Sequence, residues 1–248
     1  MFGQICRLPP NHTYHRLAER QLVVKNNKSK SWFIYAVKIG SRYGLNLYAE
    51  FTQPSTKEQW KKKAIDSIID TTFKEMMDDV ADKSTLKWVV REIFKKDQPH
   101  PIWASSSSPY HVESARIRLR MITGRYGLGL ERYVYNKKAD TTCPICQAPE
   151  DIVHMLTQCS GICCKTRTLI KRMQDIYKVH GLPPPKNEYA LTSAILNGVA
   201  YHTDIRRKYS GEVVILPEQS FTIATCTTNR IARLAHERRD KAVKEKVD

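Results

Sequence analysis

The amino-acid sequence predicts a mostly α-helical protein with little or no β-sheet. Apolar residues recur at spacings of three and four over several segments, as they do in helices with one buried face. One short segment, 211–216 (GEVVIL), has the composition of a strand. Turn-forming clusters at 105–109 (SSSSP) and 183–185 (PPP) separate the helical patterns. We therefore expect a helical N-terminal region (1–103), a linker and basic helix (104–139), a small cysteine-rich turn (140–164) and a helical C-terminal tail (165–248).

The N-terminal region is predicted to contain three helices. The clearest apolar periodicity runs from residue 57 to residue 80, and a second, shorter one covers 84–96. The segment 31–47 is rich in aromatic and aliphatic residues and fits either a helix or a strand. We favour a helix there, because Trp32, Tyr35, Ile39 and Tyr43 would share one face.

The second part is predicted to be a basic helix over 112–126. Between residues 115 and 138 the only acidic residue is Glu131, so most of the positive charge there has no local partner. Arginine and lysine can neutralise phosphates, and tyrosine can stack on unpaired bases. The residues that we expect to contact nucleic acid are Arg116, Arg118, Arg120, Arg125, Tyr126, Arg132, Tyr133, Lys137 and Lys138.

The sharpest motif lies in residues 143–159, which read CPICQAPEDIVHMLTQC. Cys143 and Cys146 are separated by two residues and are expected on a tight turn. A short helix over 151–158 would present His154 and Cys159. Three thiolates and one imidazole complete the tetrahedral shell that Zn²⁺ prefers. Because four protein ligands leave no open position, the sequence predicts a small zinc-binding turn that holds one structural zinc ion.

Other interpretations of these cysteines stay open. They could be free thiols beside an ordinary histidine, or a redox pair, although the CxxC does not open a helix after a strand as a thioredoxin-like motif would. Cys163 or Cys164 could replace Cys159, but we expect both to be ordinary buried thiols. Seven cysteines in all, four of them within 143–163, favour a metal site over disulfides in a reducing compartment.

The C-terminal tail is predicted to begin with a basic helix and to end with a longer one over 219–246. This last segment alternates apolar positions such as Ile223 and Ile231 with arginines such as Arg230 and Arg238. It is therefore expected to pack on one face and expose positive charge on the other.

The composition points to a polyanionic partner. Lysine and arginine number 41 against 25 acidic residues, a formal net charge of +16, in a chain of otherwise ordinary globular composition. Such a protein attracts nucleic acid first and an anionic membrane surface second. No apolar run approaches the roughly 20 residues of a membrane helix, and the N-terminus lacks the apolar core of a signal peptide. We expect a soluble, intracellular protein that binds no membrane.

No catalytic constellation stands out. Asp78 and Asp79 superficially resemble the paired aspartates of polymerases, but they close a helical pattern and do not lie on a hairpin. The remaining histidines have no catalytic partner at useful spacing, and no open metal site is suggested. The sequence predicts no enzyme activity and no small-molecule substrate.

Together these motifs resemble the C-terminal region of non-LTR (LINE-type) retrotransposon reverse transcriptases. ARIRLRMITGRY (115–126), followed by the Cys-x2-Cys, His and Cys segment, looks like the basic helix and zinc-knuckle-like element of that family. The segments 28–47 and 57–68 resemble the part downstream of the polymerase core, and 83–89 and 100–103 resemble the segment before the basic helix. The segment 226–239 resembles the end of such reading frames. The resemblance implies a nuclear location.

The polymerase aspartates and the acidic endonuclease site of that family are absent, and we expect them to lie upstream of Met1. The chain is therefore predicted to bind nucleic acid, RNA or DNA, without polymerase or nuclease activity. A zinc-stabilised helical scaffold for a protein partner is the alternative, and a decayed element fragment without selected function is a third. Pairing of the arginines with nearby carboxylates would favour the scaffold.

Overall fold

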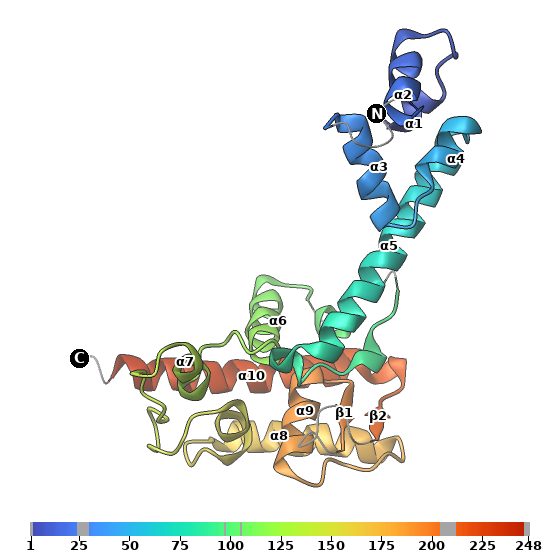
Figure 1. The fold of residues 1–248 in the computed structure, drawn as a ribbon. Helices are drawn as coiled ribbons and strands as arrows, with labels where there is room; N and C mark the ends of the chain where they lie inside the picture. Colours follow the sequence, from blue (N-terminus) through green and yellow to red (C-terminus); the bar gives the residue numbers. More distant parts are fainter. Residues whose placement is uncertain (1, 24–29, 97, 105, 204–211, 246–248) are drawn as a thin grey trace. The chain divides into compact units, whose positions relative to one another are not determined.

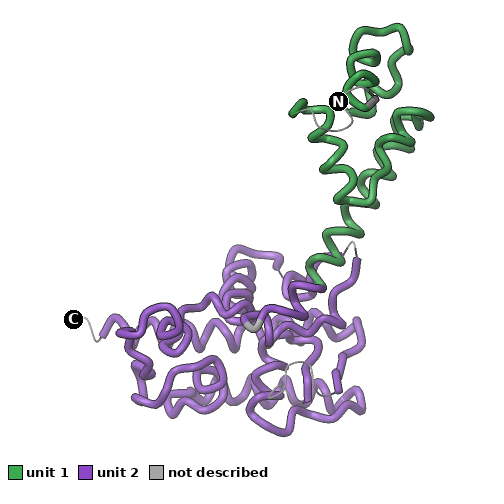
Figure 2. Tube along the Cα trace, in the orientation of Figure 1, with its two compact units in different colours: residues 1–77 green, residues 78–248 purple. Residues whose placement is uncertain are grey.

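The computed structural model describes residues 2–23, 30–96, 98–104, 106–203 and 212–245. The chain divides into two compact units, Met1–Met77 and Asp78–Asp248 (Figure 2). Both units are built mainly from helices, which confirms the predicted fold class (Figure 1). The boundary between the units falls inside α5 (Lys57–Asp82), the helix predicted over 57–80.

The first unit packs four short helices and the start of α5 around its own core. The short helices are α1 (Phe2–Cys6), α2 (Thr13–Val23), α3 (Trp32–Arg42) and α4 (Leu47–Thr52). Phe33, Ile34 and Val37 of α3 are buried in this core with residues of α1, α2 and α4. Gly40 lets α4 approach closely, since a Cβ atom there would lie 2.5 Å from Leu47 Cδ1.

The helix predicted at 31–47 is confirmed, but the face that Trp32, Tyr35 and Ile39 share is not the buried one. Trp32, Tyr35 and Ile39 are 49%, 66% and 44% exposed, while the adjacent face of α3 is buried. The helix also ends at Arg42, because Gly44 adopts a φ of 70° and turns the chain toward α4. Helical spacing shows which residues share a face, whereas only the neighbouring helices decide which face is covered.

The second unit is organised around its last helix, α10 (Phe221–Lys244). It packs against α6 on one side and against α8 and α9 on the other (Figure 1). The other helices of this unit are α6 (Pro109–Ile122), α7 (Gly129–Tyr135), α8 (Cys164–Val179) and α9 (Glu188–Asn197). The segments predicted as 104–139, 140–164 and 165–248 all lie in this unit and contribute to one shared core.

The helix predicted over 84–96 does not form. The structure has only two 3₁₀ turns there, Ser84–Leu86 and Arg91–Ile93. Trp88, Val89 and Val90 are buried one after another, which a helix with one apolar face cannot achieve. Asn197 of α9 holds this segment instead, since its Nδ2 donates to the carbonyl of Trp88 at 2.8 Å and its Oδ1 accepts from the amide of Val90 at 3.3 Å.

A short antiparallel pair of strands completes the second unit. β1 (Ala200–His202) pairs with β2 (Val213–Ile215), with Tyr201 opposite Val214. The strand predicted at 211–216 is confirmed for its central residues, and residue 211 lies outside the described part of the chain. In that described part, no helix is long and apolar enough to cross a membrane.

The predicted basic helices of this unit are present, α8 at the start of the tail and two others with shifted ends. α6 stops at Ile122, because Gly124 takes a φ of 63°, so Tyr126 lies in the loop that follows. α10 covers 221–244 of the predicted 219–246, and residue 246 lies outside the described residues. A further short helix, α7, follows this loop.

Candidate metal centre

The four predicted ligands come together in space. One ligand atom from each of Cys143, Cys146, His154 and Cys159 lies within 4.8 Å of all the others. The Sγ atoms of Cys143 and Cys159 are 3.8 Å apart, and those of Cys146 and Cys159 are 3.9 Å apart. A tetrahedral zinc with Zn–S bonds of about 2.3 Å requires sulfur atoms roughly 3.8 Å apart, whereas a disulfide requires about 2.0 Å. The cluster therefore fits a metal such as zinc, and these thiols are not paired as disulfides.

A tight turn presents the first two cysteines. The amide of Gln147 donates to the carbonyl of Cys143 at 3.0 Å, and the amide of Cys143 donates to the carbonyl of Ala148 at 2.7 Å. Gln147 has a φ of 63°, which a residue with a side chain rarely adopts. The backbone thus folds back directly after Cys146, and this places both sulfur atoms on the inner side of the turn.

A π-helical turn, His154–Gln158, presents the other two ligands. The amide of Cys159 donates to the carbonyl of His154 at 2.8 Å, five residues back. In an α-helix, five residues would rotate the side chains about 140° apart, because one turn takes 3.6 residues. The wider turn brings His154 Nε2 to within 3.1 Å of Cys146 Sγ on the same side as Cys159. The short helix expected at 151–158 is confirmed with this irregular geometry.

The surrounding protein shifts the pKa values of two of the cysteine thiols in opposite directions. A hydrogen bond from the backbone of Ala148 lowers the pKa of Cys146, which favours its thiolate. Burial raises the pKa of Cys159 to about 11, against the opposing effects of the Gly161 backbone and Arg238. A metal ion binds thiolates, so occupation of this site would displace the Cys159 proton. All four positions are filled by protein atoms, which leaves no coordination position for a substrate.

The remaining cysteines lie outside the cluster. Cys163 caps the N-terminus of α8, with its Sγ 3.3 Å from Thr166 Oγ1, and Cys164 begins that helix. Both are exposed, so the prediction that they are buried thiols is wrong. Cys159, and neither of these two, stands with the other ligands. Cys6 is buried, which raises the pKa of its thiol to about 12, and Cys226 is half-buried.

One buried carboxylate connects the cysteine turn to two helices. Glu150, which is 1% exposed, accepts two hydrogen bonds from Arg239 of α10, at 2.6 and 2.9 Å. Its Oε2 also accepts from the amide of Gly129 at the start of α7, at 2.8 Å. Arg238 donates to the carbonyl of Met155 at 2.8 Å and so holds the π-helical turn on the same helix. The candidate metal centre is therefore anchored to α10 and in turn anchors α7.

Sequence reasoning did not find Glu150, Arg238 and Arg239 as parts of this site. Glu150 lies 89 residues from Arg239, and nothing in its spacing to the cysteines marks it as buried. Gly129 carries a similar unrecognised constraint, because a Cβ atom there would lie 2.8 Å from the backbone of Asp140 and Thr141. These contacts depend on how α7, the turn and α10 pack, so no local pattern could reveal them.

The predicted nucleic-acid-binding residues divide into an exposed and a buried group. Arg116, Arg120, Arg125 and Arg132 are exposed or partly exposed, and so are Tyr133, Lys137 and Lys138. Arg116 pairs with Glu113 at 3.2 Å. Among the residues that the structure describes, the other exposed arginines and lysines of this set form no ion pair. Lys137 Nζ lies 4.5 Å from the centre of the Tyr133 ring.

Arg118 does not belong to that surface. It is fully buried between α6 and α10, where its Nη1 donates to the carbonyl of Thr225 at 3.2 Å and to the Thr228 hydroxyl. Burial lowers its pKa to about 9. Its prediction as a phosphate ligand is wrong, because the third residue of an R-x-R-x-R run on a helix faces away from the first and last, here into the core.

Tyr126 is mostly covered as well. Its hydroxyl lies 2.6 Å from Nδ1 of His236 on α10, and burial raises its pKa. The ring of Tyr126 is therefore a packing element between the loop after α6 and α10, and it is not free to stack on a base.

Comparisons with known proteins give no relative for this chain. No family model, no curated protein and no solved structure matches it. The geometry of the cysteine–histidine cluster is thus the main guide to function.

Proposed function

We propose that this protein is a zinc-stabilised nucleic-acid-binding module, in which Cys143, Cys146, His154 and Cys159 hold one structural zinc ion. The observation that carries the proposal is the attachment of α7 to the cysteine turn through Glu150. When bound, zinc would cross-link the two halves of the turn and supply no reaction chemistry. The site would therefore fix a surface for binding.

The surface that this attachment positions is basic and partly aromatic. Arg132, Tyr133, Lys137 and Lys138 lie on α7 or directly after it, and all four reach solvent. Arginines and lysines without carboxylate partners keep their full charge for phosphates. The exposed Tyr133 ring offers a face on which an unpaired base can stack. By contrast, a scaffold for a protein partner would not require these charges to stay unpaired.

We further propose that the chain corresponds to the C-terminal part of a LINE-type reverse transcriptase, on the motifs that resemble that family. Under this proposal it acts on nucleic acid in the nucleus and catalyses no polymerisation or cleavage alone. The support is the agreement between the Cys3His geometry and the zinc-knuckle-like element of that family.

The test is fluorescence anisotropy of a labelled single-stranded RNA and a DNA duplex across a salt series. Several phosphate contacts should cost roughly a thousandfold in affinity between about 50 and 200 mM salt. Replacing Arg120, Arg125 and Arg132 together by glutamine should weaken binding to every sequence and flatten the salt dependence. The protein should stay folded, because none of the three side chains is buried.

A matched control removes the same charge elsewhere. Lys83, Lys241 and Lys244 are exposed and each already pairs with a carboxylate four residues away on its own helix or at its end. Their joint replacement by glutamine should change affinity far less. Equal losses in both triple variants would show only a general charge effect, and no binding at low salt would favour the scaffold or the fragment without function.

A further inference from the structure

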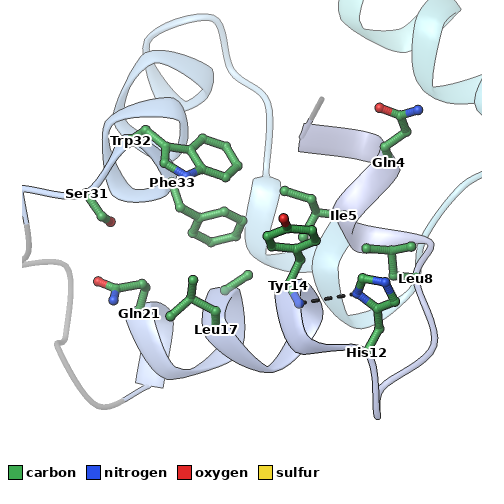
Figure 3. A pocket seen from close by; sticks show the side chains of 11 residues that line it. Gln4, Ile5, Leu8, His12, Tyr14, Leu17, Gln21, Ser31, Trp32 and Phe33 are labelled. Carbon is green, nitrogen blue, oxygen red and sulfur yellow. Dashed lines mark hydrogen bonds between the residues drawn. The ribbon is translucent and has the colours of Figure 1, made fainter.

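The first unit contains an apolar cavity that the proposed metal centre does not use. Its volume is about 700 Å³, within the range of about 300–1,000 Å³ that small-ligand sites occupy. Ile5 and Leu8 line it from α1 and the turn after it, Tyr14 and Leu17 from α2, and Trp32 and Phe33 from α3. Figure 3 shows Tyr14 and Leu17 of α2 and Phe33 of α3 directed toward the space between these two helices.

The aromatic wall of this cavity is unusually accessible. Tyr14 is 62% exposed, Leu17 51% and Trp32 49%, although each is large enough to dominate a small core. Trp32 meets Phe33 edge to face, with ring centres 5.6 Å apart, which holds the two rings at an angle. The exposed Trp32 ring, held at an angle to the buried Phe33 ring, therefore presents a face for a flat apolar group.

The edge of the cavity is polar. Gln4, His12 and Gln21 line the cavity beside the rings. Amide and imidazole groups can bond the N–H and C=O groups at the edge of a flat ring, which a hydrocarbon lacks.

The charge around the cavity favours an anionic partner. Residues 1–56 carry eight lysines and arginines and only two acidic residues, Glu19 and Glu50. Arg16 and Arg20 are exposed on α2 next to the lining positions, and Lys30 is exposed directly before α3. A polyanion that carries flat rings with N–H donors is a single-stranded nucleic acid.

We propose that this cavity receives an unstacked base of a single-stranded nucleic acid, with the base against Tyr14 and Trp32. The proposal rests on the proposed affinity of the protein for nucleic acid and adds a second contact in the first unit. Stacking of a base on aromatic side chains has little dependence on sequence, so the contact would select single strands over duplexes.

The test compares a short oligothymidylate with a strand of equal length whose sugars carry no bases. Phosphate contacts are the same in both, so a base pocket should make the first bind at least about fivefold more tightly. Tyr14→Ala and Trp32→Ala should each reduce this difference to the part that stacking on Tyr133 supplies, and they should leave the salt dependence unchanged. Tyr35→Ala is the matched control, because Tyr35 is 66% exposed on α3 and does not line the cavity.

Two results would overturn the proposal. One is equal affinity of the wild-type protein for both strands. The other is that Tyr35→Ala reduces the preference for the strand with bases as much as Tyr14→Ala and Trp32→Ala do. If the wild-type protein binds neither strand, the proposed function fails. A titration with thymidine monophosphate, followed by tryptophan fluorescence, then tests separately whether the cavity binds a base. A saturable fluorescence change that Trp32→Tyr abolishes would support the pocket, and no change would reject it.

Discussion

Residues of one type have opposite roles in this protein according to where the fold puts them. Arg118 and Arg120 stand two positions apart on α6, yet the first is fully buried and the second is exposed. Arg118 donates hydrogen bonds to a carbonyl and a hydroxyl of α10, whereas the guanidinium of Arg120 is available to solvent or a ligand. The basic run therefore contributes to the core as well as to the surface.

His100 makes the stability of the second unit depend on pH. Burial is the main cause that lowers its pKa from 6.5 to about 4, and the charge of Arg118 adds to this. The unfolded chain thus binds more protons than the folded one between these values, so the free energy of unfolding rises with pH across this window. It should fall by up to about 3 kcal/mol as the pH drops from about 6.5 to 4.

Urea unfolding at a series of pH values checks this. His100 Nδ1 accepts a hydrogen bond from the amide of Ile102 at 3.1 Å. In His100→Asn the side-chain oxygen can still accept this hydrogen bond, but the asparagine cannot gain a proton. The variant should lose clearly less stability than the wild type over the same range. Loss of metal at low pH and the titration of His202 affect both proteins alike, so identical pH profiles would rule out a role for His100.

At the scale of elements, short irregular pieces position the site. The π-helical turn places His154 and Cys159 on one side, and α7 is held by backbone contacts to Glu150. Regular helices such as α8 and α10 supply the platform. A site assembled in this way depends on a few buried polar contacts more than on helix propensity.

Glu150 combines a buried charge pair with a backbone contact to α7. Replacement by glutamine would leave the guanidinium of Arg239, 17% exposed, without its charge partner, while the amide oxygen could still accept from Gly129. Breaking a buried pair in this way should cost about 3 kcal/mol in the free energy of unfolding.

Chemical denaturation of Glu150→Gln measures that cost. Glu237→Gln is the control on α10, the helix that carries Arg239, since Glu237 is half-exposed and pairs with Arg233 one turn away. That change should cost no more than about 0.5 kcal/mol. Similar costs for the two variants would argue against a large contribution of the buried Glu150–Arg239 pair to stability.

At the scale of the whole molecule, the metal centre has a small apolar cluster of its own, separate from the main core. Cys143, Cys159 and Ile162 form this cluster, whereas the helices of the second unit share a much larger one. The two cores predict that the helical platform does not need the metal, although the cysteine turn and α7 do.

Removal of the proposed zinc ion by a chelator should therefore leave most of the far-ultraviolet circular dichroism in place. Hydrogen exchange should accelerate at the amides of Cys143, Glu150 and Leu130, and affinity for nucleic acid should fall. Cys143→Ser should behave like the chelated protein, and Cys163→Ser with Cys164→Ser like the wild type, since these two thiols lie outside the cluster. Complete unfolding on chelation would contradict the separation of the two cores.

The amino-acid sequence by itself determined the candidate metal ligands and most of the helices, because both depend on interactions at short range. Three cysteines and a histidine within 17 residues must lie close together on any compact turn, and helical periodicity repeats every few residues. Burial is different, because it depends on contacts between residues that are far apart in the chain. The covered face of α3, the extended segment around Val90, the burial of Arg118 and the Glu150–Arg239 pair were decided only by the tertiary structure. They follow from packing between elements that lie up to 110 residues apart, which no local pattern encodes.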